Sequence, residues 1–553
     1  MKKNKSLYWV YSHSKKYLPH IILNCLFCIG SSLIYVLLAY YSKRIIDTAA
    51  PNGNHALILG AVLLFGLIIL QILLNAAVSM INSYINGKLT ILFRNSLFSS
   101  VVRKKYSEVF EHHTGDLLNR FTSDIEQVVS GAATILPSLC SMLAKIISGI
   151  AALVLENYIF AFLVLGVGFI FPLIGRIISK KYKFIHKAVQ ETEGQSRSFL
   201  QESFANIVVI KTFSSESPIL DKLNLYLNKN FKMKIKRSAL QVAMNTCLNS
   251  FFTVGYYAVL VWGAGGISNG TISTGTLFYY LQLVSMLRAP LQNVSGIMPR
   301  YFSMLASAER LIELENMDIE LQSLPKENID NLKYKFNFIE ADKLSFAYDE
   351  KLIIKNSSFK IPKNNITVIT GSSGSGKSTL FKMLLGLYEP CGGSLSFNGD
   401  EQITAATRAM FSYVPQVNMI LSGTIRENLT LCNESMEDEK IINACKAAMI
   451  YDFICTLSDG LQTKVSERGA GLSEGQIQRI SIARALLFDA PILLLDESTS
   501  ALDEATESAV LSNIKNMTDK TVIFITHRNT SISVCDRIIH ITDKEFKEIE
   551  KED

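Results

Sequence analysis

Six long apolar segments, separated by polar stretches, occupy the amino-terminal part of this sequence. They cover residues 20–40, 57–81, 132–155, 158–178, 240–262 and 276–298. A helix needs about 20 apolar residues to cross a bilayer core of roughly 30 Å, and each segment is that long. The pattern therefore predicts an α-helical membrane domain with six transmembrane helices over residues 1–318.

The polar connections between these segments differ in length and charge. Those at 47–55, 156–157 and 263–275 are short and contain no Lys or Arg, whereas those at 94–125 and 179–237 are long and basic. Basic residues collect in the cytoplasmic loops of membrane proteins, so we expect both termini and the long connections in the cytoplasm. The same rule accounts for the net charge of +6, and we expect no nucleic-acid partner.

The two long connections keep a helical pattern, so we expect the membrane helices to continue into the cytoplasm. Each connection is interrupted near its middle, by Thr114–Gly115 in the first and by residues 212–218 in the second. We expect a short transverse helix at each interruption, docked on the domain that follows.

The carboxy-terminal part predicts a soluble α/β domain. Residues 319–337 are polar and predict a linker. Over residues 338–553, apolar strand-like runs alternate with helical ones, and four of these runs have the pattern of buried strands: 366–370, 410–414, 492–495 and 522–525. Such alternation favours helices packed on a mostly parallel sheet.

The run at 366–370 leads directly into the sequence GSSGSGKST, which predicts a loop that binds the phosphates of ATP. Glycines let backbone N–H groups turn towards phosphates, and the following helix directs its positive end at them. Lys377 is placed to contact the β- and γ-phosphates, and the Ser378 hydroxyl to bind Mg²⁺. The loop comprises Gly371, Ser372, Ser373, Gly374, Ser375, Gly376, Lys377, Ser378 and Thr379.

Two further strand ends carry residues suited to ATP hydrolysis. The run at 492–495 is followed by Asp496, placed to hold Mg²⁺, and by Glu497, placed as the general base that polarises the attacking water. His527 follows the run at 522–525, where the carboxyl end of a strand faces the nucleotide crevice. We expect His527 to contact the γ-phosphate.

The order of the motifs resembles the nucleotide-binding domain of ATP-binding cassette (ABC) transporters. FAYD, GSSGSGKST, YVPQ, LSEGQIQR, LLLDE, SALD and His527 follow one another along the chain. The resemblance implies that Tyr348 stacks on adenine and that Gln416 senses Mg²⁺ and couples to the membrane domain. It also implies that Ser473, Gly475 and Gln476 serve the nucleotide bound to the other subunit, with Asp503 at the dimer interface.

The membrane half is similar to the exporter-type (type IV) fold, through stretches such as TGDLLNRFTSD and QESFANIVVIKTF. The resemblance implies an ATPase half-transporter in a bacterial-type plasma membrane, working as a pair of chains. Binding of ATP closes the two ATP domains and turns the cavity outward. The implied cargo is a peptide, a lipid or an amphipathic drug-like compound.

Other functions remain open at this point. An importer of a metal chelate has the same fold, and an ATP-gated channel would carry ion currents without a fixed ratio of ATP to solute. A soluble or chromosome-associated ABC ATPase is opposed by the six apolar segments.

Two features bear on the partner and the cargo. The family usually has glycine where Glu474 stands; the carboxylate is either a tolerated variant or a sign of a heterodimer with one weakened site. Polar residues within membrane helices usually face a cavity, and Lys145 and Arg288 would suit an anionic or peptide carboxylate group. The polar residues of the predicted membrane helices that are candidates to face a cavity are Asn24, Gln71, Asn75, Lys145, Asn245, Asn249, Gln282, Arg288, Gln292 and Asn293.

Overall fold

A computed structural model of the chain describes two compact units. The first comprises residues 1–101 and 114–316, and the second comprises residues 102–113 and 317–553. The described residues are all except 1, 50–53, 113, 157–183, 417–419, 467–468, 470, 527, 529–531, 533 and 550–553, and the side chains of 2–4, 49, 54–56, 248 and 291–295 are also left undescribed.

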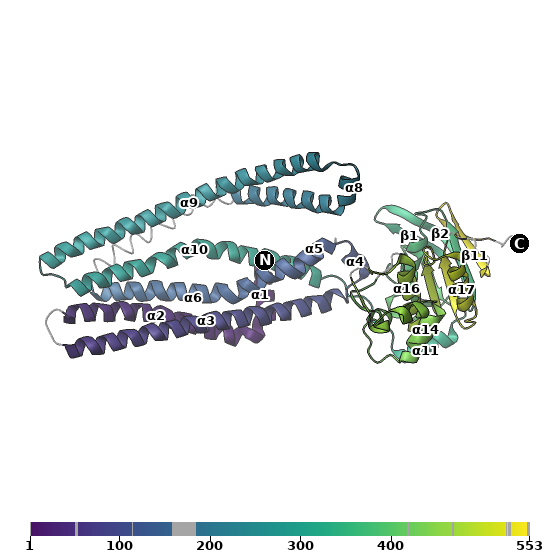
Figure 1. Ribbon diagram of the computed structural model, residues 1–553, viewed down its shortest axis with the longest axis horizontal. Helices are drawn as coiled ribbons and strands as arrows, with labels where there is room; N and C mark the ends of the chain where they lie inside the picture. The colour runs from purple at the N-terminus through teal and green to yellow at the C-terminus, as the bar shows by residue number, and fades with distance from the viewer. Residues whose placement is uncertain are drawn as a thin grey trace. The chain divides into compact units, whose positions relative to one another are not determined.

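The first unit is built from long helices (Figure 1). Its elements are α1 (Lys2–Ser14), η1 (Lys15–Tyr17), α2 (Leu18–Ala49), α3 (Asn54–Val101), α5 (Thr114–Asn119), the π-helical turn η2 (Arg120–Asp124), α6 (Ile125–Glu156), α8 (Ile207–Thr212), α9 (Glu216–Ser268) and α10 (Thr274–Glu315), together with helical residues 184–205. Helix α3 has 48 residues, which is about 70 Å at a rise of about 1.5 Å per residue. This helix is longer than a bilayer core of roughly 30 Å, and its continuation into the cytoplasm stays a prediction.

Four helical segments of the described chain are long and apolar enough to cross a membrane: Lys5–Thr48, Leu57–Val101, Thr114–Glu156 and Glu216–Ser268. They contain the first, second, third and fifth predicted spans. The sixth lies in α10, which is helical throughout and contains Pro290 and Pro299. The fourth, 158–178, lies outside the described residues.

Close packing of α2, α3, α6 and α10 forms the centre of this unit (Figure 1). Gly131 on α6 shows how near α10 approaches, because a Cβ atom there would lie 2.6 Å from the Met304 sulfur. Helix α9 packs against α10 and also along residues 184–205, where the rings of Phe199 and Tyr226 are 5.3 Å apart.

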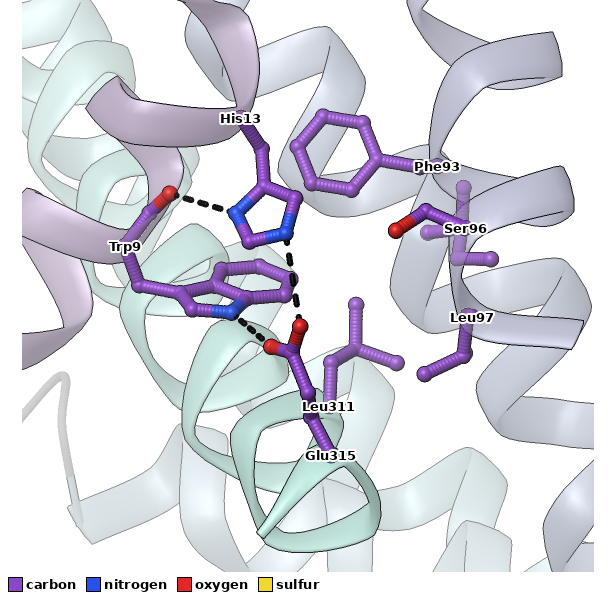
Figure 2. A pocket seen from close by; sticks show the side chains of 8 residues that line it. Trp9, His13, Phe93, Ser96, Leu97, Leu311 and Glu315 are labelled. Atoms are coloured by element: carbon purple, nitrogen blue, oxygen red, sulfur yellow. Dashed lines mark hydrogen bonds and ion pairs between the residues drawn. The ribbon is translucent and has the colours of Figure 1, made fainter. Parts of the chain in front are cut away.

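The amino-terminal helix α1 is tied to the end of α10 (Figure 2). The Trp9 indole N–H donates to Glu315, the last residue of α10. His13 Nε2 lies 3.5 Å from the other Glu315 carboxylate oxygen, and the His13 ring stacks on Phe93 at 5.7 Å. The Glu315 carboxylate therefore contacts both Trp9 and His13 of α1.

The second unit contains two main sheets. Four strands form an antiparallel sheet in the order β2-β1-β4-β5, and six form a sheet in the order β12-β11-β3-β10-β9-β6. Within the six-stranded sheet only β12 is antiparallel to its neighbour. The predicted α-helical membrane domain followed by an α/β domain with a mostly parallel sheet is confirmed.

The strands of this unit are β1 (Phe338–Tyr348), β2 (Lys351–Pro362), β3 (Ile366–Gly371), β4 (Gly392–Phe397), β5 (Glu401–Gln402), β6 (Phe411–Val414), β7 (Gly423–Thr424), β8 (Lys464–Val465), β9 (Ile492–Asp496), β10 (Thr521–Ile525), β11 (Arg537–Thr542) and β12 (Glu545–Ile549). The helices are α4 (Tyr106–Phe110), α11 (Lys326–Lys335), η3 (Ala405–Met410), α12 (Lys377–Leu384), α13 (Ile425–Thr430), α14 (Asp438–Ala447), α15 (Tyr451–Thr456), η4 (Gly460–Gln462), α16 (Glu474–Phe488) and α17 (Glu504–Lys515). Helix α11 lies in the stretch predicted as a linker.

Both faces of the six-stranded sheet are buried. Ile492 and Leu494 of β9 face a core shared with the antiparallel sheet, while Leu493 and Leu495 face a core shared with the helices α13 to α17. A strand covered on both faces needs apolar residues at every position. This explains why the central strands read as unbroken apolar runs.

Helix α4 belongs to the second unit although it lies between two membrane helices in the sequence. Tyr106 packs edge-on against Tyr388 with ring centroids 5.7 Å apart, and Lys105 pairs with Glu389 at 3.2 Å. The transverse helix expected near Thr114–Gly115 is therefore present, slightly earlier in the chain. Helix α8 stands at the second interruption, and its docking stays a prediction.

A buried carboxylate joins the start of α6 to α10. Asp124 is 1% exposed and accepts hydrogen bonds from Arg310 Nε at 2.7 Å and from the Ser307 hydroxyl at 2.9 Å. A buried charge is tolerated only when it is paired and hydrogen-bonded. This pair therefore fixes the register of the two helices.

We expect Arg310→Leu to destabilise the membrane unit by about 3 kcal/mol, because it leaves the Asp124 carboxylate buried without its cation. The midpoint of thermal unfolding in detergent measures the change. The double variant Asp124→Asn/Arg310→Leu serves as control and should recover part of the loss, since no unpaired charge remains. Equal midpoints for native and Arg310→Leu protein would contradict this account.

Candidate functional site

The candidate site lies at one edge of the six-stranded sheet. Strands β3, β10, β9 and β6 are parallel neighbours, so their carboxyl ends meet at the same edge. These ends carry the phosphate loop after β3, Asp496 and Glu497 at β9, and Gln416 just after β6. In open α/β sheets, ligands bind outside the carboxyl ends of the strands. His527, which follows β10 by two positions, lies outside the described residues.

The phosphate loop has a backbone shape that glycine alone adopts without strain. Gly374 has φ 76° and Gly376 has φ 113°, both in the left-handed region. A Cβ atom at Gly376 would also lie 2.9 Å from Ile353 Cγ2 on β2. The loop then opens directly into α12, whose first turn presents free backbone N–H groups.

Lys377 is buried at the base of this loop. Its side chain is 6% exposed, and its Nζ donates to the carbonyl oxygens of Gly371 at 2.7 Å and Ser372 at 2.9 Å. Burial lowers the pKa of Lys377, while the neighbouring carboxylates of Glu497 and Asp496 oppose that shift. The ammonium group therefore lies between the loop carbonyls and the acidic strand end.

The residues around Asp496 fit a magnesium ion held by oxygen ligands. Asp496 is 2% exposed and accepts hydrogen bonds from the Ser378 hydroxyl at 3.2 Å and the Tyr413 hydroxyl at 3.4 Å. Burial raises the pKa of Asp496, and both hydroxyl contacts act to lower it. Carboxylate and hydroxyl oxygens are ligands that Mg²⁺ accepts in phosphate sites.

The loop also contains an unused hydroxyl group. Ser375 Oγ is buried and has no hydrogen-bond partner within the described part of the chain. Buried polar atoms in native proteins nearly always have a partner. A phosphate oxygen held by the loop would supply one, so the loop fits the nucleotide expected from the sequence.

Glu497 is held in an unusual conformation. Its φ of 47° lies in the left-handed region, and its backbone N–H donates to the Ile525 carbonyl at 2.9 Å. Residues other than glycine adopt this conformation at a cost, and such positions collect at active sites. Gln416 Nε2 donates to Glu497 Oε2 at 2.7 Å, so the two predicted residues are in direct contact.

Tyr348, expected to stack on adenine, borders the phosphate loop. It ends β1, whose partner strand β2 carries Ile353 against Gly376. The half-buried ring of Tyr348 packs edge-on against Phe346 at 4.9 Å and Tyr388 at 5.3 Å. These contacts fix the ring at the rim of the loop.

The second motif, LSEGQ, starts helix α16. Ser473 caps the helix: Gln476 N–H donates to Ser473 Oγ at 3.3 Å, and Ser473 N–H donates to Gln476 Oε1 at 2.8 Å. A Cβ atom at Gly475 would lie 2.9 Å from the Ala501 carbonyl oxygen. Glu474 is the first residue of the helix and is exposed, so its side chain meets no comparable obstacle.

The structure divides the predicted residues into two groups. It joins Lys377, Ser378, Gln416, Asp496 and Glu497 at one edge of the sheet. Among the described residues, no hydrogen bond connects Ser473, Gly475 or Gln476 to the phosphate loop of the same chain.

Sequence reasoning missed Gln478, which fastens the start of α16 to the segment after Glu497. Gln478 is 1% exposed; its Nε2 donates to Ser500 Oγ at 3.2 Å, and its Oε1 accepts from Ala501 N–H at 3.0 Å. A polar residue among the buried positions of a helix was the available signal.

The ion pair of Arg528 and Glu507 was also missed. Glu507 is 1% exposed and accepts from Arg528 at 2.8 Å and from the Thr499 hydroxyl at 2.8 Å. Arg528 also donates to the Leu502 carbonyl at 3.0 Å. These bonds also hold residues 499–502 in place, and no local sequence pattern predicts them.

Comparison with known proteins identifies both units. Residues 21–291 match the ABC transporter transmembrane region, and residues 354–500 match the ABC transporter family. A probable ABC transporter ATP-binding/permease protein of Haemophilus influenzae is 32% identical over 83% of this chain and 83% of that protein. The lactococcin-G-processing and transport ATP-binding protein LagD of Lactococcus lactis is 28% identical over 91% of this chain and 72% of that protein.

A solved structure shares the fold. A bacterial Atm1-family ABC exporter with ATP bound superposes with a TM-score of 0.81 at 22% identity, covering 96% of this chain and 95% of that chain. The similarity extends through the membrane unit and the ATP-binding unit alike.

We expect Gln478→Leu to reduce nucleotide hydrolysis by about tenfold, because losing two buried hydrogen bonds frees residues 500–501. Binding of a fluorescent ATP analogue should stay unchanged, since the phosphate loop is not touched. Ser500→Ala is the matched control. It removes one of the two hydrogen bonds and should reduce hydrolysis by less. Full hydrolysis by Gln478→Leu would show that this contact has no role in the site.

Proposed function

This chain belongs to the ABC transporter family and is an ATPase half-transporter of the exporter type, and from that premise we propose that it exports an amphipathic solute by alternating access as part of a dimer. The cargo class is a peptide, a lipid or a drug-like amphiphile. The observation that carries the proposal is the contact of Glu497 with Gln416 beside Asp496 and Ser378, in a chain whose other unit consists of membrane-spanning helices. A peptide cargo is supported by the name of the relative LagD, a lactococcin-G-processing and transport protein.

The phosphate loop is proposed to bind the triphosphate of ATP. Lys377 would turn from the loop carbonyls to the β- and γ-phosphates, and the Ser375 hydroxyl would donate to a phosphate oxygen. Asp496, Ser378 and Gln416 would hold Mg²⁺, which supplies charge neutralisation when bound. Tyr348 would stack on the adenine ring.

Glu497 is proposed to act as the general base. Its carboxylate would accept the proton of the attacking water, and the Gln416 amide orients it at 2.7 Å. The left-handed backbone at Glu497 sets the direction of the side chain away from the strand. His527 is proposed to contact the γ-phosphate because β10, which precedes it, lies beside β3.

The working unit is proposed to be a dimer. Ser473, Gly475 and Gln476 make no described bond to their own phosphate loop, so we assign them to the nucleotide of a second chain. Asp503 caps α17 by accepting from Thr506 N–H at 3.0 Å, and it would lie at the interface of the two ATP-binding domains. The amino-terminal end of α16 from the second chain would complete the site described above.

We propose that the chain resides in the plasma membrane with its ATP-binding unit in the cytoplasm. The basic connections at 94–125 and 179–237 support this orientation. Inverted vesicles separate export from import: ATP-driven accumulation of solute inside them supports export, and loss of preloaded solute supports the importer of a metal chelate.

Glu497→Gln tests the hydrolysis proposal. The amide cannot accept the proton, so we expect ATPase activity to fall by about a hundredfold or more. ATP binding should persist because the phosphate loop and Asp496 are unchanged. The measurement is phosphate release by purified protein in nanodiscs, with ATP affinity as the companion measurement. Undiminished ATPase activity would exclude Glu497 as the base.

Glu474→Gly tests whether the unusual signature residue weakens the site. Glu474 is exposed at the start of α16, where the helix dipole favours a carboxylate. We therefore expect the ATPase activity of the chain alone to change by less than about twofold. If the native chain alone is inactive and Glu474→Gly restores activity, the pair is instead a heterodimer with one weakened site.

A further inference from the structure

A polar cavity lies among the helices of the membrane unit. Its volume is about 480 Å³, and residues of α2, α3, α6 and α10 line it. Pockets for small molecules are typically about 300–1,000 Å³. Pro137 of α6 and Pro290 of α10 both face it, and a proline within a helix bends the helix and removes a backbone hydrogen bond. Two proline-containing helices therefore border a space large enough for a solute headgroup.

The cavity carries positive charge without a balancing carboxylate. Lys145 and Arg300 line it, and no Asp or Glu is found among its described lining residues. Neither cation forms an ion pair within the part of the chain that the structure describes. Lys145 is held at 5.0 Å above the Tyr35 ring. Lys145 lies within the predicted span at 132–155, where an ionisable residue is costly and usually marks a ligand or ion path, whereas Arg300 is exposed and follows the predicted span at 276–298.

A buried acceptor supplies a second, independent observation. Asn24 lines the same cavity and is 1% exposed, yet its Oδ1 has no hydrogen-bond partner in the described residues. An amide oxygen this deeply buried is normally satisfied. The missing partner is an N–H or O–H donor.

Arg288, named with Lys145 as a candidate for an anionic group, does not line this cavity. Its guanidinium donates to Asn249 Oδ1 at 2.7 Å. The cation that joins Lys145 is Arg300, twelve positions further along α10. The side chains of Gln292 and Asn293 lie outside the described residues.

We propose that this cavity binds the anionic headgroup of the transported solute. The carboxylate or phosphate lies between Lys145 and Arg300, and an adjacent N–H or O–H of the solute donates to Asn24. The inference rests on the proposed role of this unit as the transport path, and it narrows the cargo to acidic amphiphiles that carry a hydrogen-bond donor beside the charge.

Two pairs of probes test the charge preference on the native chain. The first is N-lauroyl-glycyl-phenylalanine and its carboxy-terminal amide; the second is lysophosphatidic acid and the uncharged monoacylglycerol. Equilibrium dialysis against protein in a maltoside detergent measures binding without any need for ATP. We expect at least one acid to bind about tenfold more tightly than its neutral twin, as charge-assisted hydrogen bonds allow. The pair that shows the preference separates a peptide source from a lipid source.

Variants then locate the preference. Lys145→Gln and Arg300→Gln should each weaken binding of the preferred acid by about tenfold and leave its neutral twin unaffected. Arg288→Gln, a matched change on α10 outside the cavity, should alter neither. Equal binding of acid and twin in both pairs by the native chain overturns the proposal, whether or not the variants fold.

The outcome is distinguishable from failure of the export proposal. Neutral twins that bind and stimulate the ATPase as well as the acids would overturn the anionic cavity while export stands. Acid-selective binding in a chain that hydrolyses no ATP would support the cavity and contradict the export function.

Discussion

The parallel arrangement of four neighbouring strands is the constraint on which the ATP site depends. Strands β3, β9 and β6 are far apart in the sequence, but parallel pairing puts their carboxyl ends at one edge. That edge brings the Lys377 loop, the acidic pair and Gln416 within bonding reach, and left-handed backbone at Gly374, Gly376 and Glu497 shapes the site locally. Burial of both sheet faces holds the strands in register, so the packing of the core also determines where these site residues lie.

The segment at 102–113 packs within the second unit. It follows α3 directly, yet it belongs to the compact unit that holds the ATP site. Tyr388 contacts both Tyr106 of this segment and Tyr348 at the rim of the phosphate loop. Closely packed aromatic rings cannot shift independently, so the position of helix α4 and that of the predicted adenine platform are linked.

The sequence predicted the elements well because their signals are local. Apolar length marked the membrane helices, unbroken apolar runs marked the central strands, and GSSGSGKST marked the phosphate loop. Contacts between distant residues carried no such signal. Gln478 stood out only as a polar residue among the buried positions of α16, and its contacts, like those of Arg528 with Glu507, became visible only once folding brought them to residues 499–502.

The sequence analysis named Arg288 and not Arg300, and helical geometry explains why Arg300 is the one that lines the cavity. Twelve residues rotate a side chain by about 120° around an α-helix, and Pro290 lies between the two positions. One arginine therefore faces Asn249 and the other faces the cavity. Charge identifies candidate ligand-binding residues along a helix, but the angular position of each side chain around the helix decides which of them line the same cavity.

The uninterrupted length of α3 has a mechanical consequence. A helix of 48 residues behaves as a stiff rod of about 70 Å that ends where the segment at 102–113 begins. Tilting such a rod by about 5° moves its far end by about 6 Å, which is more than the width of a strand spacing. Because of its length, helix α3 converts a small change in its own tilt into a displacement of several ångströms at one end.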